Sequence, residues 1–364
     1  MNENETMTLF ARNIVIGFLL MFPLATAQAQ SIDVVKVADG VYAAIRKEPP
    51  GLTTNANSVF IINDDDVIVV DTSLTPSTAR ELLAALRKLT DKPVKYVVNT
   101  HWHDDHIMGN QVFREAFPGV EFIAHARTRD YLPTTGLANR TIAMSERGYP
   151  QFIKALRSRL EKGESHFGGP LNDEERSILA SDIKIAEGYM AENPRVEIVL
   201  PTTTFEDRLT LYRGGRTIEI LYLGRGHTSS DIVVHLPKER VVITGDLVIW
   251  PVPYAGSPQS HPADWSASLE RLLALHPTTI VPGHGPVLHD ESYVRLMIEL
   301  FRSIKQQVEA SIARGENLEQ TRKNINLKSF QERFAGDSRI RNLIFDSYVV
   351  GPAVEAAFLD ATQK

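Results

Sequence analysis

The segment THWHDDH, residues 100–106, places three histidines and two aspartates within seven positions. A strand-like run precedes it, and side chains alternate faces in an extended chain, so His101 and His103 point the same way and can bind one metal ion. A helical pattern begins at about residue 108, so the chain must turn, which lets Asp105 and His106 face a second ion. Imidazole nitrogens and carboxylate oxygens are ordinary zinc ligands. We therefore interpret the segment as a metal-binding loop rather than a histidine-rich surface loop.

The spacing of this loop resembles the H-x-H-x-D-H signature of the metallo-β-lactamase-fold hydrolases. Three later segments match the same family in order, namely residues 226–228 (GHT), 244–246 (TGD) and 282–285 (PGHG). Each of these short motifs is weak alone, but four in order form a specific pattern. The resemblance covers residues 33–290. It implies an α/β fold, the αββα sandwich, with a dinuclear metal site at one edge of its two sheets.

The resemblance also implies a ligand set, because seven positions match those that hold the two metal ions in the family. The matching residues are His101, His103 and His227 for one ion, Asp105, His106 and His284 for the other, and Asp246 as the bridge between them. All seven carry competent ligands, which implies an active metal-dependent hydrolase. Ligation by histidine and aspartate alone suits zinc, so we expect two zinc ions per chain, with iron or manganese as alternatives.

In such enzymes a metal-bound hydroxide attacks the substrate, and Asp105 is the candidate catalytic residue that orients it or passes its proton to the leaving group. Asp246 bears on the substrate, because hydroxyacylglutathione hydrolases and lactonases carry aspartate at the matching position, whereas true metallo-β-lactamases typically carry cysteine or serine. We therefore predict attack on the carbonyl of a small ester, lactone or thioester. A periplasmic class B β-lactamase that hydrolyses β-lactam antibiotics is the alternative, because the N-terminal sequence predicts export.

Two further residues are candidates near the site. Asp71 ends a predicted strand over residues 67–71, and it either orients a ligand histidine or caps the loop that follows. Tyr254 lies in a loop rich in proline and aromatic residues after Asp246, and Tyr254 or another residue of this loop is a candidate for stabilising the oxyanion.

The N-terminus predicts export from the cytoplasm. Residues 14–24 form an apolar run between Arg12 and the sequence Ala27-Gln28-Ala29, which has the order of a secretory signal peptide. The run is too short for a comfortable membrane span. We predict that residues 1–29 are removed and that the mature protein is periplasmic or secreted, with no stable membrane anchor. An uncleaved anchor is the alternative, and translation begins at Met1 or Met7.

Composition limits the class of partner. The 364 residues include 43% hydrophobic and 23% charged residues, as in ordinary globular proteins, and the formal net charge is −6. The sequence has no long basic run, which argues against nucleic acid as a partner and favours a small-molecule substrate. It has no cysteine, so neither a disulfide nor a thiolate ligand can form.

The pattern of elements divides the chain into three parts after the signal peptide. Residues 30–290 are predicted to form the metallo-β-lactamase-fold domain, with a strand at 196–200 among those of its second half. A helical insertion at about 127–195, with a long helical pattern over 141–162, either walls the substrate site or is a solvated helical pair. Residues 291–364 are predicted to form a helical C-terminal extension that either packs on the domain or forms a dimer contact. In the second case the protein would be a homo-oligomer.

Overall fold

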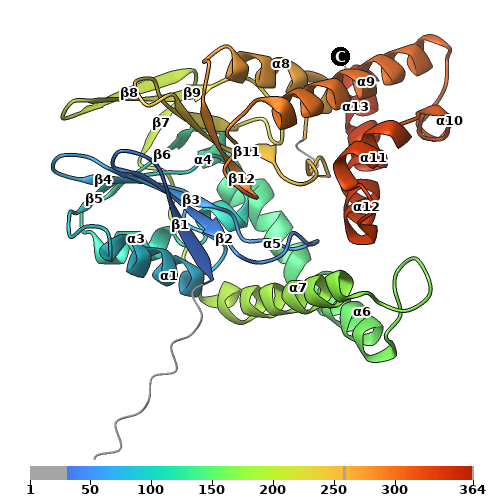
Figure 1. The fold of residues 1–364 in the computed structure, drawn as a ribbon, viewed down its shortest axis with the longest axis horizontal. Helices are drawn as coiled ribbons and strands as arrows, with labels where there is room; N and C mark the ends of the chain where they lie inside the picture. The colour runs from blue at the N-terminus through green and yellow to red at the C-terminus, as the bar shows by residue number, and fades with distance from the viewer. Residues whose placement is uncertain (1–30, 257–259, 363–364) are drawn as a thin grey trace, which may run out of the picture. The chain divides into compact units, whose positions relative to one another are not determined.

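The computed structural model describes residues 31–256 and 260–362, so the predicted signal peptide lies outside the described residues. Two β-sheets face each other and carry helices on their outer faces (Figure 1). Over the part of the chain that the structure describes, the first sheet has seven strands in chain order. They are β1 (Ile32–Ala38), β2 (Val41–Arg46), β3 (Ser58–Ile62), β4 (Val67–Val70), β5 (Val94–Val98), β6 (Glu121–His125) and β7 (Thr203–Phe205).

Within the described residues the second sheet has five strands, and neighbours in this sheet are also consecutive in the chain. From one edge to the other they are β12 (Thr279–His284), β11 (Val241–Ile249), β10 (Ile232–Leu236), β9 (Arg216–Tyr222) and β8 (Arg208–Arg213). Buried aliphatic side chains from both sheets form one cluster between them, which includes Val59, Ile68, Ile220 and Val234. Their strands read as nearly continuous apolar runs because both faces of each strand are covered.

Helices cover the outer face of each sheet (Figure 1). On the first sheet they are α1 (Pro76–Arg87) and α3 (Asn110–Ala116), whose apolar faces pack on Phe60 and Val97. Thr75 begins α1 as its N-cap, since its side chain accepts a hydrogen bond from the backbone N–H of Thr78. The αββα sandwich expected from the resemblance is confirmed.

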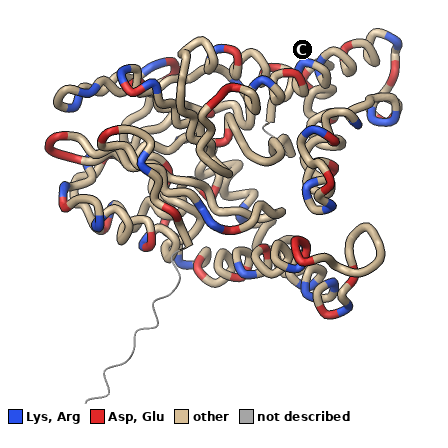
Figure 2. The backbone as a smooth tube through the Cα atoms, in the orientation of Figure 1, with Lys and Arg blue, Asp and Glu red and all other residues tan. Residues whose placement is uncertain are grey.

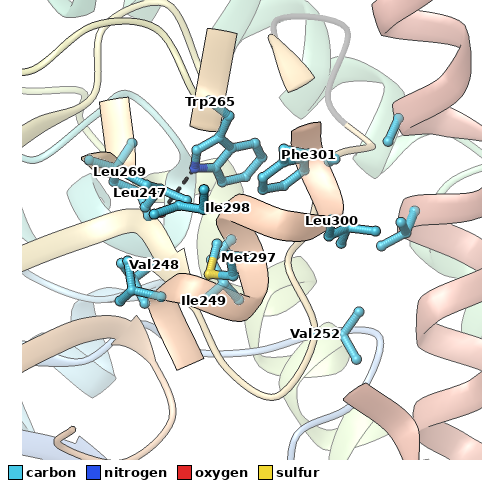
Figure 3. Close-up of a cluster of buried hydrophobic side chains, with 14 of the residues drawn as sticks. Leu247, Val248, Ile249, Val252, Trp265, Leu269, Met297, Ile298, Leu300 and Phe301 are labelled. Carbon is cyan, nitrogen blue, oxygen red and sulfur yellow. Dashed lines mark hydrogen bonds between the residues drawn. The ribbon is translucent and has the colours of Figure 1, made fainter. Parts of the chain in front are cut away.

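The second sheet is covered by α8 (Pro262–Leu273) and by the first helix of the C-terminal extension, α9 (Ser292–Ala313). Figure 3 shows their contact, where the rings of Trp265 and Phe301 stack with centroids 4.4 Å apart. The indole nitrogen of Trp265 also donates a hydrogen bond to the carbonyl oxygen of Leu247 at 3.0 Å. The extension is therefore packed into the main core, and it continues as α10 (Leu318–Asn324), α11 (Lys328–Ala335), α12 (Arg339–Phe345), the π-helical turn η3 (Asp346–Val350) and α13 (Pro352–Thr362).

The helical insertion connects β6 to β7, which pair directly in parallel with Ile123 opposite Thr203. Its elements are α4 (Ala126–Tyr131), the π-helical turn η1 (Leu132–Gly136), α5 (Leu137–Met144), α6 (Tyr149–Lys162), α7 (Asp173–Glu192) and the 3-10 turn η2 (Asn193–Arg195). The single helical pattern predicted over residues 141–162 is wrong, because it breaks between α5 and α6. Gly148 allows this break, since a Cβ atom there would lie 2.3 Å from the carbonyl oxygens of both Ile142 and Ala143.

The strand predicted at residues 196–200 is also wrong. The apolar side chains Val196, Ile198 and Leu200 pack against a cluster that contains Trp102, but the segment pairs with no strand of the described chain. Sheet pairing begins only at β7. Among residues 31–256 and 260–362, none of the helices has both the length and the apolar character needed to span a lipid bilayer.

The direction of the strands explains why the loops that carry the candidate site residues lie close together. β4, β5 and β6 are parallel, so the loops that follow them leave the same edge of the first sheet. In the second sheet β11 and β12 are also parallel. The 100–106 loop, which contains the short helix α2 (Asp104–Ile107), follows β5, and the insertion follows β6.

Candidate metal centre

All seven residues expected to bind metal come together at the edges of the two sheets. Four lie in the loop and helix after β5, one follows β9, one lies within β11 and one ends β12. They form two groups, in each of which the candidate ligand atoms lie within 4.8 Å of one another. The first group is His101, His103, His227 and Asp246, and the second is Asp105, His106 and His284.

Asp246 faces both groups with different oxygens. Its Oδ2 lies 3.3 Å from His227 Nε2 and 3.8 Å from His101 Nε2, in the first group. Its Oδ1 lies 3.2 Å from His106 Nε2 and 3.3 Å from His284 Nε2, in the second. One carboxylate can therefore serve two ions, as a bridging ligand must.

Asp105 completes the second group. Its Oδ2 lies 3.1 Å from His284 Nε2 and 3.5 Å from His106 Nε2. The side chain of Asp105 is 19% exposed, whereas that of His106 is fully buried. Asp105 is thus the carboxylate of this group that also reaches the open cavity above it.

The buried polar atoms of the two groups fit bound metal. Within the described chain, His101 Nε2, His106 Nε2 and Asp246 Oδ1 are buried without a hydrogen-bond partner. Leaving such an atom unsatisfied costs roughly 1–3 kcal/mol, and these three point into the spaces between the candidate ligands. An ion in each group would satisfy them, and the donor set of imidazole nitrogen and carboxylate oxygen suits zinc, iron or manganese.

Protonation differs between the two groups. Burial lowers the pKa of His103 to about 3, so its neutral imidazole is available as a ligand at neutral pH. Burial also disfavours a charge on His284, but the carboxylates of Asp246 and Asp105 outweigh it and raise its pKa to about 9. Metal binding in the second group must therefore displace a proton.

Two of the candidate ligand histidines are oriented by hydrogen bonds at Nδ1. Asp71 Oδ2 lies 2.7 Å from His106 Nδ1, and the carboxylate of Asp71 also accepts hydrogen bonds from the backbone N–H and hydroxyl of Thr100. His227 Nδ1 donates to the carbonyl oxygen of Tyr254 at 2.7 Å. A proton held on Nδ1 leaves Nε2 free to bind an ion. Of the two interpretations of Asp71, the structure favours the one in which it orients a ligand histidine.

Glycines in two of the motifs allow close approach. A Cβ atom on Gly283 would lie 2.0 Å from Asp246 Oδ1, so the PGHG segment can lie beside the bridging carboxylate only with glycine there. Gly245 has a φ of +48°, and a Cβ atom would lie 2.3 Å from the hydroxyl oxygen of Thr100. The glycines of these short motifs are therefore needed for the close packing of the site, in addition to the candidate ligands that the motifs contain.

Asp104 was not identified from the sequence, although it lies in the metal loop. Its Oδ1 accepts a hydrogen bond from Arg140 Nη1 at 3.0 Å, and its Oδ2 accepts one from the hydroxyl of Tyr189 at 2.6 Å. Arg140 belongs to α5 and Tyr189 to α7. Asp104 thus joins the metal loop to the insertion. The only hint in the sequence was an aspartate at a family position that binds no ion.

A cavity of about 270 Å³ opens over the two groups, and the metal-binding candidates His103, Asp105, His227, Asp246 and His284 line it. Aromatic rings from four parts of the chain complete its wall. They are Trp102 from the metal loop, Tyr149 and Tyr189 from the insertion, Tyr254 from the loop after β11, and Tyr348 from the C-terminal extension. Of the two interpretations of the insertion, the structure supports the wall. Within the described chain, neither lysine nor arginine lines this cavity.

The tyrosine hydroxyls of this cavity differ in their partners. Tyr254 donates to the carbonyl oxygen of Gly51 at 2.7 Å, Tyr348 donates to that of Leu52 at 3.0 Å, and Tyr189 donates to Asp104. Tyr254 is therefore wrong as the candidate oxyanion donor, because its proton is held by the backbone. The hydroxyl of Tyr149 has no hydrogen-bond partner among the described residues, and burial raises its pKa, so it remains a protonated donor.

Comparison with known proteins identifies relatives over the region that carries these groups. The sequence profile of the Metallo-beta-lactamase superfamily matches residues 52–284. A linear primary-alkylsulfatase from Pseudomonas sp. (strain ATCC 19151) is 30% identical over 243 residues, which cover 65% of this chain and 43% of the alkylsulfatase. The chain thus spans less than half of that relative.

Two other relatives have different names. A type 2 metallo-beta-lactamase from Bacillus sp. (strain 170) is 24% identical over 241 residues, covering 65% of this chain and 69% of the relative. A hydroxyacylglutathione hydrolase from Gloeobacter violaceus (strain ATCC 29082 / PCC 7421) is 40% identical over 80 residues, covering 21% of this chain and 30% of the relative. The relatives therefore do not agree on a substrate.

The solved structure of the metallo-beta-lactamase TMB-1 superposes with a TM-score of 0.51 at 16% sequence identity. The match covers 75% of this chain and 97% of TMB-1. At that identity the likeness supports the fold alone.

Proposed function

The chain belongs to the metallo-beta-lactamase superfamily of hydrolases, and we propose that it uses two zinc ions to hydrolyse an uncharged ester, lactone or thioester. One observation carries the choice of substrate. The cavity over the Asp246-linked groups is walled by aromatic rings and has no lysine or arginine among its described lining residues. Such a wall suits an apolar substrate body, because an anionic group that lies against it, away from the proposed ions, would find no cationic side chain.

In this proposal the first group would hold one ion and the second group the other, and Asp246, which faces both groups, could bind both ions. The bound ions supply Lewis acidity and lower the pKa of bound water. Asp105 reaches the cavity, where it orients the attacking water and accepts a proton from it as the water oxygen bonds to the acyl carbon. As the bond to the leaving oxygen or sulfur breaks, Asp105 returns a proton to it. The free hydroxyl of Tyr149 donates to the developing oxyanion.

The same observation weighs against the alternative, a β-lactamase. Its substrates carry a carboxylate, and binding enzymes usually pair such a group with a cationic side chain. The bridging position of Asp246 adds negative charge where the anionic nitrogen of an opened β-lactam would need stabilising. Lysines and arginines are also interspersed with acidic residues along the described backbone (Figure 2), so a small molecule suits this chain better than a nucleic acid.

The test is a hydrolysis panel on purified, zinc-loaded protein. Acetate esters, acyl lactones and acyl thioesters should be turned over with higher kcat/KM than a nitrocefin-type β-lactam. Elemental analysis should find two zinc ions per chain. A clear preference for the β-lactam would overturn the proposal, and hydrolysis of an alkyl sulfate above all acyl compounds would redirect it toward the chemistry named for the Pseudomonas relative.

A histidine variant ties this activity to the site. His103→Ala should lower metal content and reduce ester kcat/KM by at least about 100-fold, because even residues behind the ligands change metal affinity 10–100-fold. The matched control is His289→Ala, since His289 is exposed and outside both groups. Full metal content and normal turnover in His103→Ala would mean that the reaction occurs elsewhere.

A further inference from the structure

A second cavity, of about 260 Å³, lies between the insertion and the C-terminal extension. We call it the tail cavity. Eight of its twelve lining residues have large apolar side chains. Leu156 and Leu179 come from α6 and α7, while Ile340 and Leu343 come from α12. The two parts are joined at this point, since Ser338 donates a hydrogen bond to Glu174 at 2.8 Å and Arg339 forms an ion pair with Glu175.

Three of the four polar residues that line the tail cavity already have partners, and the fourth, Ser347, is exposed. Arg159 Nη2 lies 3.2 Å from His166 Nδ1. Glu175 pairs with Arg339 and accepts a hydrogen bond from the hydroxyl of Ser165. The surface left for a ligand is therefore aliphatic and aromatic, and a hydrocarbon chain is the chemistry that suits it.

The cavity over the two candidate metal-binding groups, which we call the metal-site cavity, lies beside the tail cavity. Their linings share one residue and contain neighbouring residues at two further places. Leu52 lines both cavities. Phe152 lines the tail cavity one turn along α6 from Tyr149, which lines the metal-site cavity, and their ring centroids are 6.2 Å apart. Ser347 in the tail cavity directly precedes Tyr348 in the other.

Leu52 lies between the two cavities, and its backbone is held in place by two hydrogen bonds. Its backbone N–H donates to Asp182 Oδ2 at 3.1 Å, and its carbonyl oxygen accepts from Tyr348 at 3.0 Å. Its side chain is only partly buried and can change rotamer while the backbone stays in place. Each cavity alone is smaller than the roughly 300 Å³ at the lower end of ligand sites, whereas the two joined lie within the usual range.

We propose that the tail cavity binds a linear aliphatic chain of the substrate while the substrate's acyl bond lies at the metal centre. This inference rests on the proposed ester hydrolysis and names its substrate class as medium-chain aliphatic esters and thioesters. Each methylene that enters the tail cavity raises kcat/KM by up to about fourfold, because burying one removes its apolar surface from water.

The experiment is a chain-length series, from p-nitrophenyl acetate to p-nitrophenyl decanoate, on the zinc-loaded protein. The variant Leu343→Trp fills the tail cavity. It should reduce kcat/KM for decanoate by at least about tenfold and leave acetate within about twofold, since it removes the space of several methylenes. The matched control is Leu359→Trp, because Leu359 is 40% exposed on α13 and lines neither cavity. Equal effects on acetate and decanoate, or none on either, overturn the inference.

Two further measurements keep the test decisive. If Leu343→Trp fails to fold, Ser347→Trp fills the same cavity from an exposed position and should give the same selective loss. If no ester is hydrolysed at any length, the proposed function fails, and calorimetric titration with 1-decanol then tests the cavity alone. Binding to the wild type that is weakened in the filled variant supports the tail cavity. Equal binding by both proteins, or none, overturns it.

Discussion

Asp71 adopts a backbone φ of +58° while its carboxylate accepts three hydrogen bonds from the metal loop. Among non-glycine residues, aspartate and asparagine adopt positive φ most readily. Asp71→Asn should therefore keep the backbone and remove the charge behind His106. We expect affinity for the second metal ion to fall by roughly 10–100-fold, as for other residues that orient ligand histidines.

Competition with a chelator measures this affinity. The control is Asp130→Asn, since Asp130 is exposed on α4 and lines neither cavity. An unchanged zinc affinity in Asp71→Asn would show that Asp71 serves only the turn after β4.

Among the described tyrosines that line the metal-site cavity, Tyr149 is the one whose hydroxyl has no hydrogen-bond partner. Tyr149→Phe removes this donor and keeps the ring that packs against Tyr189, whose centroid is 5.2 Å away. We expect kcat for acetate esters to fall by about 100-fold with little change in KM, because an oxyanion donor acts mainly in the transition state. Tyr212→Phe is the control, as Tyr212 is 75% exposed. A loss confined to KM would instead make Tyr149 a part of the binding wall.

At the scale of elements, α7 fixes the loop before β3 through one buried carboxylate. Asp182 accepts hydrogen bonds from the backbone N–H groups of Leu52 and Thr53, both at 3.1 Å. Burial raises the pKa of Asp182 from 3.8 to about 6, because these hydrogen bonds offset the loss of solvent only in part. The folded state therefore binds this proton more tightly than the unfolded state does.

The resulting change in stability has a definite sign. The contribution of Asp182 is full below pH 3.8 and is lost as pH rises through about 6, at a cost of roughly 3 kcal/mol. Urea denaturation across pH 4.5–7.5 should show Asp182→Asn gaining stability relative to the wild type as pH rises. Asp173→Asn, at an exposed position on the same helix, is the control. Parallel pH profiles for the wild type and Asp182→Asn would contradict this assignment.

The elements also show what sequence can predict. The positions of the candidate ligands and the two sheets follow from local motifs and strand patterns, because the residue spacing in the 100–106 loop and the direction of the strands fix them. The strand predicted at 196–200 was wrong, because Val196 and Ile198 pack their apolar side chains against a cluster that includes residues of the helical insertion. In a strand the same apolar pattern would pack between the sheets. Asp104 was missed because its partner Tyr189 lies 85 positions away, and only the packing of α7 brings them together.

At the scale of the whole molecule, one prediction concerns the N-terminus of the mature protein. We expect exported protein to begin at Gln30, since Ala27 and Ala29 form the well-placed A-x-A site. N-terminal sequencing of the exported protein decides this. The variant Ala29→Asp should block cleavage, because the site requires small residues. Membrane-bound wild type that retains Met1 or Met7 would show an uncleaved anchor instead.

The direct pairing of β6 with β7 has a consequence for how such a protein can diverge. Because Ile123 lies opposite Thr203, the sheet is continuous on both sides of the insertion, and a lineage can lengthen, shorten or replace the intervening helices while the ligand scaffold is inherited intact. The extension that carries Tyr348 lies after the last candidate ligand, but its packing in the main core and its contacts with Glu174 and Glu175 limit how far it can vary. Asp104 sets the limit on such drift, since a new insertion must still supply partners for its buried carboxylate. Substrate range and catalytic chemistry are thereby exposed to selection on different stretches of the gene.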